Sequence, residues 1–534
     1  MQGRRREMKK RHLSFVAAVF VFIGAAIPLF CAEVSEKQDI AIFGLTAEAF
    51  DIPTDVLLYV DTSMNNVFVN LKRFNVLGYG DYRIEAKDTE EFIARIREAR
   101  AQKAAEAGTY DEKFGTIVIK GEDFDRIANS FLLVMPTLSN YYVGSRREEV
   151  QSGDAVYFRR VYTAEVVIDL AFVNVSEGKQ EEAVRVTGTG SDQSVDRAGR
   201  LAVDSAITSL APKIRQIEAF KIKSGVILVR GDTITFELGK GIGVKPGEEF
   251  EVMTKQEVGK TGRIVELPTG LVKVKKTYPE TSEGRIVYQK ERITEGDQLV
   301  EVAKAGIQVS FNAGVMKVDI PDMRYDIAVV DDNLSFVNYF YIDLDQKERD
   351  LSPVVALTVE KSLGYRFKGI FEGTALLNFP LFGGIGELGA GAVFQKRRLS
   401  FDLSALGGLL YMTTFQQRIN RNVIFNSILI EGTSIDFADD PVMNIYGVSV
   451  GVKGSAGLTF LVKPGLALNL GAAYRLYTPI RNWTIRIAET AGSDKDSVNL
   501  KSDSPNIVEL PTSGKMKQVN ISGYEFTLAF TARF

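Results

Sequence analysis

The residue types that most often carry catalysis are nearly absent from this chain of 534 residues. Its only histidine is His12 and its only cysteine is Cys31. Beyond residue 31 there is therefore no imidazole general base, no thiolate nucleophile, no His/Cys metal site and no disulfide. A Ser-Lys or paired-carboxylate mechanism stays formally open, but no spacing singles out such a pair. We predict a non-enzymatic protein without a cofactor or a metal.

Three short motifs have simpler explanations than the chemistry they resemble. The glycines from Gly239 to Gly247 are not followed by a helix that would offer its N-terminus to a phosphate, so they predict a turn between strands. Gly259-Lys260-Thr261 matches the end of a phosphate-binding loop, but Thr254 stands where that loop needs glycine. Arg230-Gly231-Asp232 spells a receptor-binding tripeptide and predicts a hairpin turn.

The remaining candidates are charged residues in the last 230 residues, and alternating strands must position them. Successive side chains of a strand point to opposite faces, so a strand between lipid and a polar interior alternates apolar and polar residues. The last strand has this pattern, because its apolar face carries Tyr524, Phe526, Leu528, Phe530 and Phe534. About eight such strands follow residue 306, which is near the lower limit for closed transmembrane barrels.

The connections between these strands give an independent indication. If both ends of a barrel lie in the periplasm, its connections alternate between long outer loops and short inner turns. Long connections are expected at about 318–352, 413–444 and 477–521, and short ones at Gly364, 395–398 and 462–465. The connection at 380–384 is short where a long one is usual. A soluble β-sandwich also has alternating strands but seldom this asymmetry, so residues 306–534 predict an antiparallel transmembrane β-barrel.

The inward face of this barrel is the best place to look for activity. By strand phase it carries nine charged residues, namely Glu360, Lys368, Glu372, Glu387, Asp402, Lys453, Arg475, Glu525 and Arg533. Eight strands leave room inside only for side chains or one small ligand. Since isolated charges there are costly, we expect the nine to pair with one another and fill the barrel. A narrow pore is the alternative.

A strand that ends on a C-terminal Phe resembles the terminal strand of bacterial outer-membrane β-barrels, and the region resembles OmpA-type barrels. The resemblance implies that outer-membrane lipid surrounds the barrel. It also implies that the barrel-assembly machinery reads the apolar face of the last strand.

Residues 1–32 have the features of a secretory signal peptide. Six basic residues fall among the first eleven, and an apolar run extends from Leu13 to Phe30. The run is just long enough to span a bilayer, so an uncleaved anchor is the alternative. Cys31 is the candidate for lipidation, although Pro28-Leu29-Phe30 makes a poor lipobox. Cleavage after Ala32 would instead leave bulky Phe30 where a small residue is preferred.

Residues 33–220 predict an α/β domain. Helices are expected at 55–71, at 88–107 and from Ser194 to about Pro212, with two long strands at 129–146 and 155–175. The turn "NVSEGK" and the stretch "GTGSDQSVDRAGRLAVDSAITSLAPKI" resemble the CsgG-like domain of curli assembly, in which a Gly-rich strand leads into an Ala-rich helix. This chain departs from that family by carrying a whole barrel of its own, whereas the family shares one barrel among subunits.

Residues 221–305 predict a small β-domain. The stretches "FELGKGIGVKPGEEFEV", "TGRIVELPTGLVKVKK" and "ITEGDQLVEV" resemble the C-terminal domain of FlgT-type flagellar proteins. Together the two resemblances imply a periplasmic assembly or scaffold role.

The expected function is therefore an outer-membrane-anchored periplasmic scaffold or assembly protein of the cell envelope. Its partners would be periplasmic proteins or other copies of itself. The formal net charge of −3 does not indicate a nucleic-acid partner. The alternatives are a small outer-membrane pore or transporter, or a surface adhesin that acts through the outer loops.

Overall fold

The computed structural model describes most of the chain. The described residues are 32–47, 52–79, 82–83, 89–101, 112–114, 117–128, 130–152, 155–174, 177, 179–258, 263–304, 306–321, 327–329, 348–378, 381–414, 417–418, 427–430, 433–436, 442–488, 497–509 and 518–533. The predicted signal peptide up to residue 31, with Cys31, and the terminal Phe534 lie outside them. Within the described residues, no helix is long and apolar enough to cross a membrane.

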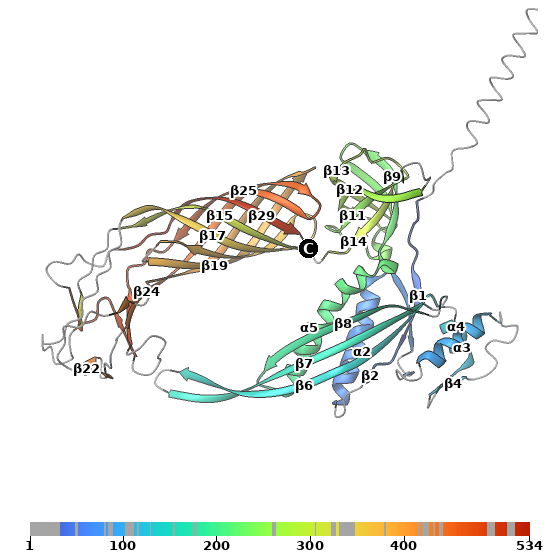
Figure 1. Ribbon diagram of the computed structural model, residues 1–534, viewed down its shortest axis with the longest axis horizontal. Helices are drawn as coiled ribbons and strands as arrows, with labels where there is room; N and C mark the ends of the chain where they lie inside the picture. Colours follow the sequence, from blue (N-terminus) through green and yellow to red (C-terminus); the bar gives the residue numbers. More distant parts are fainter. Residues whose placement is uncertain are drawn as a thin grey trace, which may run out of the picture.

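Three units follow one another along the chain, and the second, a small β-barrel, has the long third unit to its left and the first unit below it in Figure 1. The first is an α/β unit built on one sheet with the strand order β3-β1-β6-β7-β8, in which β2 also pairs with β6. Its strands are β1 (Gln38–Phe43), β2 (Thr46–Ala47), β3 (Phe74–Tyr79), β6 (Leu132–Ser152), β7 (Ala155–Asn174) and β8 (Lys179–Asp192). Strand β1 runs parallel to β3 and β6, and β6, β7 and β8 are antiparallel.

Helices cover both faces of this sheet. Helices α2 (Thr54–Leu71) and α5 (Val195–Gln216) pack on one face, and α3 (Thr89–Ala101) and α4 (Gly121–Ala128) pack on the other around β1. A small hairpin of β4 (Glu112–Phe114) and β5 (Ile117–Ile119) lies between α3 and α4 in the chain. Ser194 is the N-cap residue of α5 as expected, but the helix continues past Pro212.

Close packing of strand β8 against helix α5 explains the two glycines in the sequence "GTGSD". A Cβ atom on Gly188 would lie 2.1 Å from the carbonyl oxygen of Ala202 and 2.3 Å from the backbone nitrogen of Ala206. A Cβ atom on Gly190 would lie 2.4 Å from the carbonyl oxygen of Ala198. Strand and helix backbones therefore touch directly, which requires glycines on β8 and alanines on α5.

The second unit is a closed barrel with the strand order β10-β13-β12-β11-β14-β9. Its strands are β9 (Lys223–Arg230), β10 (Thr233–Glu237), β11 (Glu249–Val258), β12 (Arg263–Thr277), β13 (Thr281–Gln289) and β14 (Gln298–Val302). The tripeptide Arg230–Asp232 includes the turn between β9 and β10, where Gly231 has a φ of 61°. The glycines from 239 to 247 surround a single 3₁₀ turn, η3 (Lys240–Ile242), which is not a phosphate-binding helix.

A buried carboxylate joins the first two units. Glu301 on β14 accepts hydrogen bonds from Arg73 Nη1 at 2.9 Å and from Arg215 Nε at 2.7 Å, and its side chain is fully buried. Burial favours a higher pKa for Glu301, but the two guanidinium groups outweigh burial and hold that pKa below its usual value. The α/β unit, which supplies both arginines, is thus held to the small barrel by a charge-assisted contact.

The third unit is a closed antiparallel barrel of eight strands, as the sequence predicts. Its strands are β15 (Ile307–Ile320), β17 (Arg349–Ser362), β18 (Phe367–Leu376), β19 (Leu381–Lys396), β20 (Leu399–Thr414), β24 (Val442–Lys463), β25 (Leu466–Tyr477) and β29 (Gly523–Arg533). Each strand pairs with its neighbour in the chain, and β15 pairs with β29 to close the barrel. We call this unit the long barrel.

The two ends of the long barrel differ. The turns 363–366, 397–398 and 464–465 lie at one end, which we call the turn end, and it faces the small barrel (Figure 1). Longer connections leave the far end, where β21 (Gln417–Arg418), β26 (Thr484–Ala488) and β27 (Ser497–Lys501) extend the sheet. The short connection expected at 380–384 is 377–380, because β19 begins at Leu381.

The close contact between β8 and α5 yields a prediction. Gly188→Ala should lower the free energy of unfolding of the α/β unit by about 3 kcal/mol, because the added methyl would overlap backbone atoms of α5 and the Cβ of Ala206, which cannot move aside. The measurement is urea unfolding of the full chain, in which proteolytic cleavage within residues 32–220 reports the unfolding of the α/β unit. Gly78→Ala is the matched control, since a Cβ there meets no atom within 4 Å. Equal midpoints for the two variants would show that the helix and the strand are not in direct contact.

Candidate functional site

The outer face of the long barrel is apolar and exposed. Phe311, Leu388, Val450, Leu470 and Phe526 lie on five different strands, and each exposes more than half of its surface. The same face of β29 presents Tyr524, Phe526, Leu528 and Phe530, as predicted from the alternation. A continuous exposed apolar band of this kind marks a surface that is covered in the functional protein.

The inner face holds all nine charged residues that the strand phase placed there. Seven of them are buried, namely Lys368, Glu372, Glu387, Asp402, Lys453, Arg475 and Glu525. Glu360 and Arg533, which lie nearer the turn end, are half-buried. The strands therefore bring these side chains together in one closed interior.

Arg475 is the centre of this group and is completely buried. Its Nη2 donates to Glu372 Oε1 at 3.0 Å and to Glu387 Oε2 at 2.9 Å, and its Nη1 donates to Glu525. Tyr477 adds a hydrogen bond to Glu387 Oε1 at 2.9 Å. Three carboxylates thus share one guanidinium, whose planar fork of donors suits such an arrangement.

The register of the sheet explains why a cation must stand at this point. Glu372 on β18 lies directly opposite Glu387 on β19. Like charges in that position repel each other, and the repulsion is stronger in a buried site than in water. Arg475 reaches both carboxylates from β25 on the other side of the barrel, and so it turns a repulsive pair into a bridge.

Two lysines complete the charged layer. Lys453 Nζ lies 2.5 Å from Glu372 Oε1 and 3.4 Å from Glu525 Oε1. Lys368 Nζ lies 2.7 Å from Glu360 Oε1 and 3.0 Å from Asp402 Oδ1. Each cation of the layer therefore contacts at least two carboxylates, which agrees with the expectation of a filled interior.

The charged layer does not have the chemistry of a metal centre. Among the residues that the structure describes, no group of three or more His, Cys, Asp or Glu side chains could hold a metal ion. Each of the five carboxylates is instead bound by at least one cationic side chain. The arrangement can hold the eight strands in register.

Sequence reasoning missed a second, apolar layer nearer the far end. It is built of inward-facing strand residues and of residues from the connection before β29, including Met316, Val318, Ile320, Leu376, Leu410, Met412, Trp483 and Ile521. Trp483 exposes 1% of its surface. Apolar side chains thus pack together inside the barrel at this level, and paired charges fill only part of the interior.

A signal for this layer is present in strand β15. Up to Val315 the odd-numbered residues are apolar and point outward, but Lys317 and Asp319 on the same face are polar and exposed. Met316 and Val318 on the inner face are buried. The apolar phase of the strand therefore changes faces near residue 315, so the strand passes from an apolar surrounding to an aqueous one.

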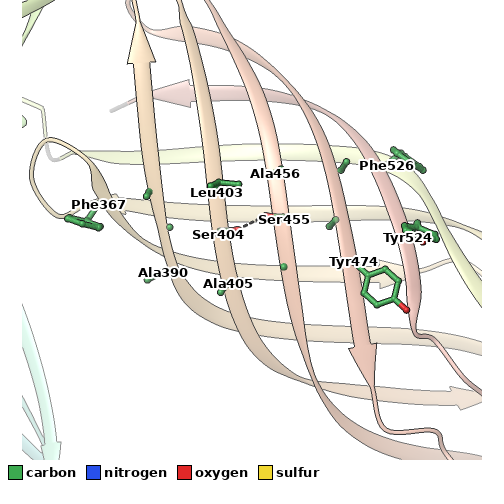
Figure 2. A pocket seen from close by; sticks show the side chains of 15 residues that line it. Phe367, Ala390, Leu403, Ser404, Ala405, Ser455, Ala456, Tyr474, Tyr524 and Phe526 are labelled. Carbon is green, nitrogen blue, oxygen red and sulfur yellow. Dashed lines mark hydrogen bonds between the residues drawn. The ribbon is translucent and has the colours of Figure 1, made fainter.

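A shallow groove of about 770 Å³ runs across the outer face (Figure 2). Its floor is made of small residues such as Ala390, Ala405 and Ala456, and Phe367 and Tyr474 stand at its edges. Ser404 and Ser455 also line it, and their hydroxyls hydrogen-bond to each other. No charged side chain of the described residues therefore lines the groove.

The shared guanidinium yields a prediction. Arg475→Met should destabilise the folded long barrel by about 3–5 kcal/mol, because it leaves three buried carboxylates without their common cation. The measurement is the temperature at which the folded barrel loses its fast mobility in a detergent gel. Arg481→Met, at an exposed site, is the control and should change little.

A rescue variant separates charge from shape. Adding Glu387→Gln and Glu525→Gln to Arg475→Met should recover much of the lost stability, because Glu372 stays paired with Lys453 and no buried charge is then unpaired. If Arg475→Met alone behaves like Arg481→Met, the ion pairs do not hold the barrel together.

Comparisons with known proteins give only remote similarities. No family model matches the chain, and no curated protein matches it. Neisserial surface protein A is 11% identical, with 43% of this chain and 97% of that chain covered and a TM-score of 0.22. A major outer membrane protein from Thermus thermophilus is 10% identical over 43% and 99% of the two chains, with a TM-score of 0.23. Lipoprotein GNA1162 from Neisseria meningitidis is 12% identical over 32% and 96%, with a TM-score of 0.18. Similarities this low assign neither a family nor an activity, so the CsgG-like and FlgT-like resemblances stay predictions.

Proposed function

We propose that this chain is an outer-membrane protein in which the long barrel is an anchor and the first two units form a periplasmic scaffold. The exposed apolar band on the long barrel supports the membrane placement, because lipid is the medium that such a band requires. The polar outer residues that begin at Lys317 on β15 mark the level at which the strand leaves the bilayer.

The observation that carries the anchor role is the filled interior. Paired charges occupy the middle of the barrel and an apolar cluster occupies the far end. An eight-stranded barrel has little space to spare, so these two layers leave no continuous path for water or solute. The barrel therefore fixes the chain in the membrane and does not transport.

The scaffold role rests on the shape of the α/β unit. Strands β6 and β7 are 21 and 20 residues long, and β8 pairs with β7 only as far as Tyr162. Beyond that point the two strands form a ribbon that extends away from the helices (Figure 1). Phe158 near its tip is 65% exposed. A protruding ribbon with an exposed aromatic side chain provides a surface that a periplasmic protein or another copy can bind.

Protease and epitope accessibility on intact cells tests the arrangement. Tags are inserted near Asn426 and near Gly108 in the sequence. We expect the Asn426 tag to be accessible from outside and the Gly108 tag to become accessible only after the outer membrane is permeabilised. Exposure of neither tag, together with a soluble protein, would refute the membrane anchor. Steady discrete openings of the purified protein in planar bilayers would refute the closed interior.

The apolar band yields a prediction that separates lipid from water. Leu403→Arg and Val450→Arg should each cost about 2–4 kcal/mol of barrel stability near the bilayer midplane. Leu58→Arg on helix α2 is the control, because Leu58 is 56% exposed but outside the barrel, and a surface change there should stay within about 0.5 kcal/mol. The measurement is denaturant unfolding in lipid vesicles. If Leu403→Arg costs as little as Leu58→Arg, the outer face of the long barrel lies in water.

A further inference from the structure

The turn end of the long barrel contacts the small barrel through the turn 397–398. Arg397 Nε donates to Asp232 Oδ1 at 2.7 Å. Arg398 Nη2 donates to the carbonyl oxygen of Gln289 at 3.2 Å, and its guanidinium lies 4.3 Å from the centre of the Tyr288 ring. One two-residue turn of the long barrel is thus bound to two separate parts of the small barrel, the β9–β10 turn and the end of β13.

The other two turns are bound as well. A Cβ on Gly247 of the small barrel would lie 2.5 Å from the carbonyl oxygen of Gly364, so the two backbones touch. Lys304, which follows the last strand of the small barrel, donates to the carbonyl oxygen of Pro464 at 3.2 Å. Arg533, at the end of β29, binds Glu249 on β11. The small barrel and its exit segment therefore contact all three turns and the last strand.

The contact is also apolar at the mouth itself. Leu461 and Ala467 belong to the inner face of the long barrel at its turn end, and each is less than 5% exposed. They form a cluster with Leu271, Val287 and Tyr288 of the small barrel. Inward-facing residues at the mouth of the long barrel thus pack against another unit, as the two sides of a buried interface do.

A lysine of the small barrel reaches the charged interior. Lys273 on β12 is 7% exposed and lies 5.9 Å from the centre of the Tyr365 ring. It lines a cavity of about 60 Å³ together with Lys368 and Asp402 of the charged layer. Burial lowers the pKa of Lys273, and Glu249 acts in the opposite direction.

The position of Lys273 matches the charge of the interior. The charged layer has five carboxylates, from Glu360 to Glu525, but only three cations. Its group nearest the turn end has two carboxylates, Glu360 and Asp402, for the single cation Lys368, and this group lines the same cavity as Lys273. The two units are thus complementary in charge as well as in shape.

From these contacts we infer that residues 223–302 act as a stopper, which closes the turn end of the long barrel and shields its charged interior from periplasmic water. This role goes beyond the scaffold function, since it concerns the long barrel itself. It is independent of the membrane placement, so it can be tested in detergent without any bilayer.

Thiol labelling of the full-length protein in detergent tests the stopper. Ser310→Cys places a thiol on the inner face near the turn end, where Ser310 is 7% exposed, and Glu295→Cys places one on an exposed loop of the small barrel. A water-soluble thiol reagent is followed by mass spectrometry of peptides, so that Cys31 is counted separately. We expect position 310 to react at least about tenfold more slowly than position 295, which corresponds to about 1.4 kcal/mol of protection. Equal rates would overturn the proposal.

A second comparison loosens the stopper. Arg397→Asp with Arg398→Glu replaces both cations of the turn by groups that repel Asp232 and the Gln289 carbonyl, and aspartate tolerates the φ of 52° at position 397. In this background position 310 should react about tenfold faster. Lys396→Glu is the matched control, because Lys396 is exposed beside the same turn, and it should leave the rate unchanged. Equal rates in the two backgrounds would contradict the stopper.

The gel mobility of each variant shows whether its barrel is folded. If the double variant does not fold, the comparison of positions 310 and 295 in the otherwise unchanged protein still decides. Loss of the membrane anchor in the cell experiments would leave this result untouched, so the two proposals fail separately.

Discussion

The pairing of Glu372 with Glu387 is the constraint around which the long barrel is built. The register of β18 and β19 places the two carboxylates directly opposite each other, and both side chains are buried, where like charges repel more strongly than in water. Arg475, on the opposite side of the barrel, binds both carboxylates and offsets their repulsion. A contact across the barrel forms only if all the strands between the two residues are in register. The ion bridge between Arg475 and the two carboxylates therefore depends on the closure of the sheet.

Much of the long barrel can be predicted from sequence because a strand between two media has a period of two. Successive residues such as Glu525 and Phe526 face the interior and the outside of the barrel in turn. Eight strands with this alternation, joined by connections of alternating length, predict the closed sheet. The inward phase of the nine charges follows from the same rule. Their partners do not, because Arg475 and Glu372 are 103 residues apart and the alternation carries no information about which strands face each other across the interior.

The apolar far end and the closed turn end escaped prediction for different physical reasons. At the far end the alternation continues but its apolar face changes near Met316, so sequence reasoning ended the strand at Val315 and counted Val318 in the outer loop at 318–352, whereas β15 continues to Ile320. At the turn end, Arg397 and Arg398 have the composition of an ordinary exposed turn. Only the folded chain shows that Asp232 and Tyr288, more than a hundred residues earlier, lie against them.

Specific contacts connect the long barrel to the two units that precede it in the chain. A hollow barrel attached by a flexible segment would leave its cargo free to turn. Here the charged layer connects the strands of the long barrel to one another. The small barrel is bound by three turns of the long barrel and by Arg533, and its Glu301 binds Arg215 on helix α5. Two of these joints, Arg215–Glu301 and Arg533–Glu249, are buried or partly buried charge pairs. The Arg397–Asp232 pair is exposed, and Lys304 donates to a backbone carbonyl. A buried charge pair with a directional hydrogen bond fixes geometry more than it adds stability. The orientation of the α/β unit relative to the small barrel thus follows from specific side chains, as the proposed scaffold role requires.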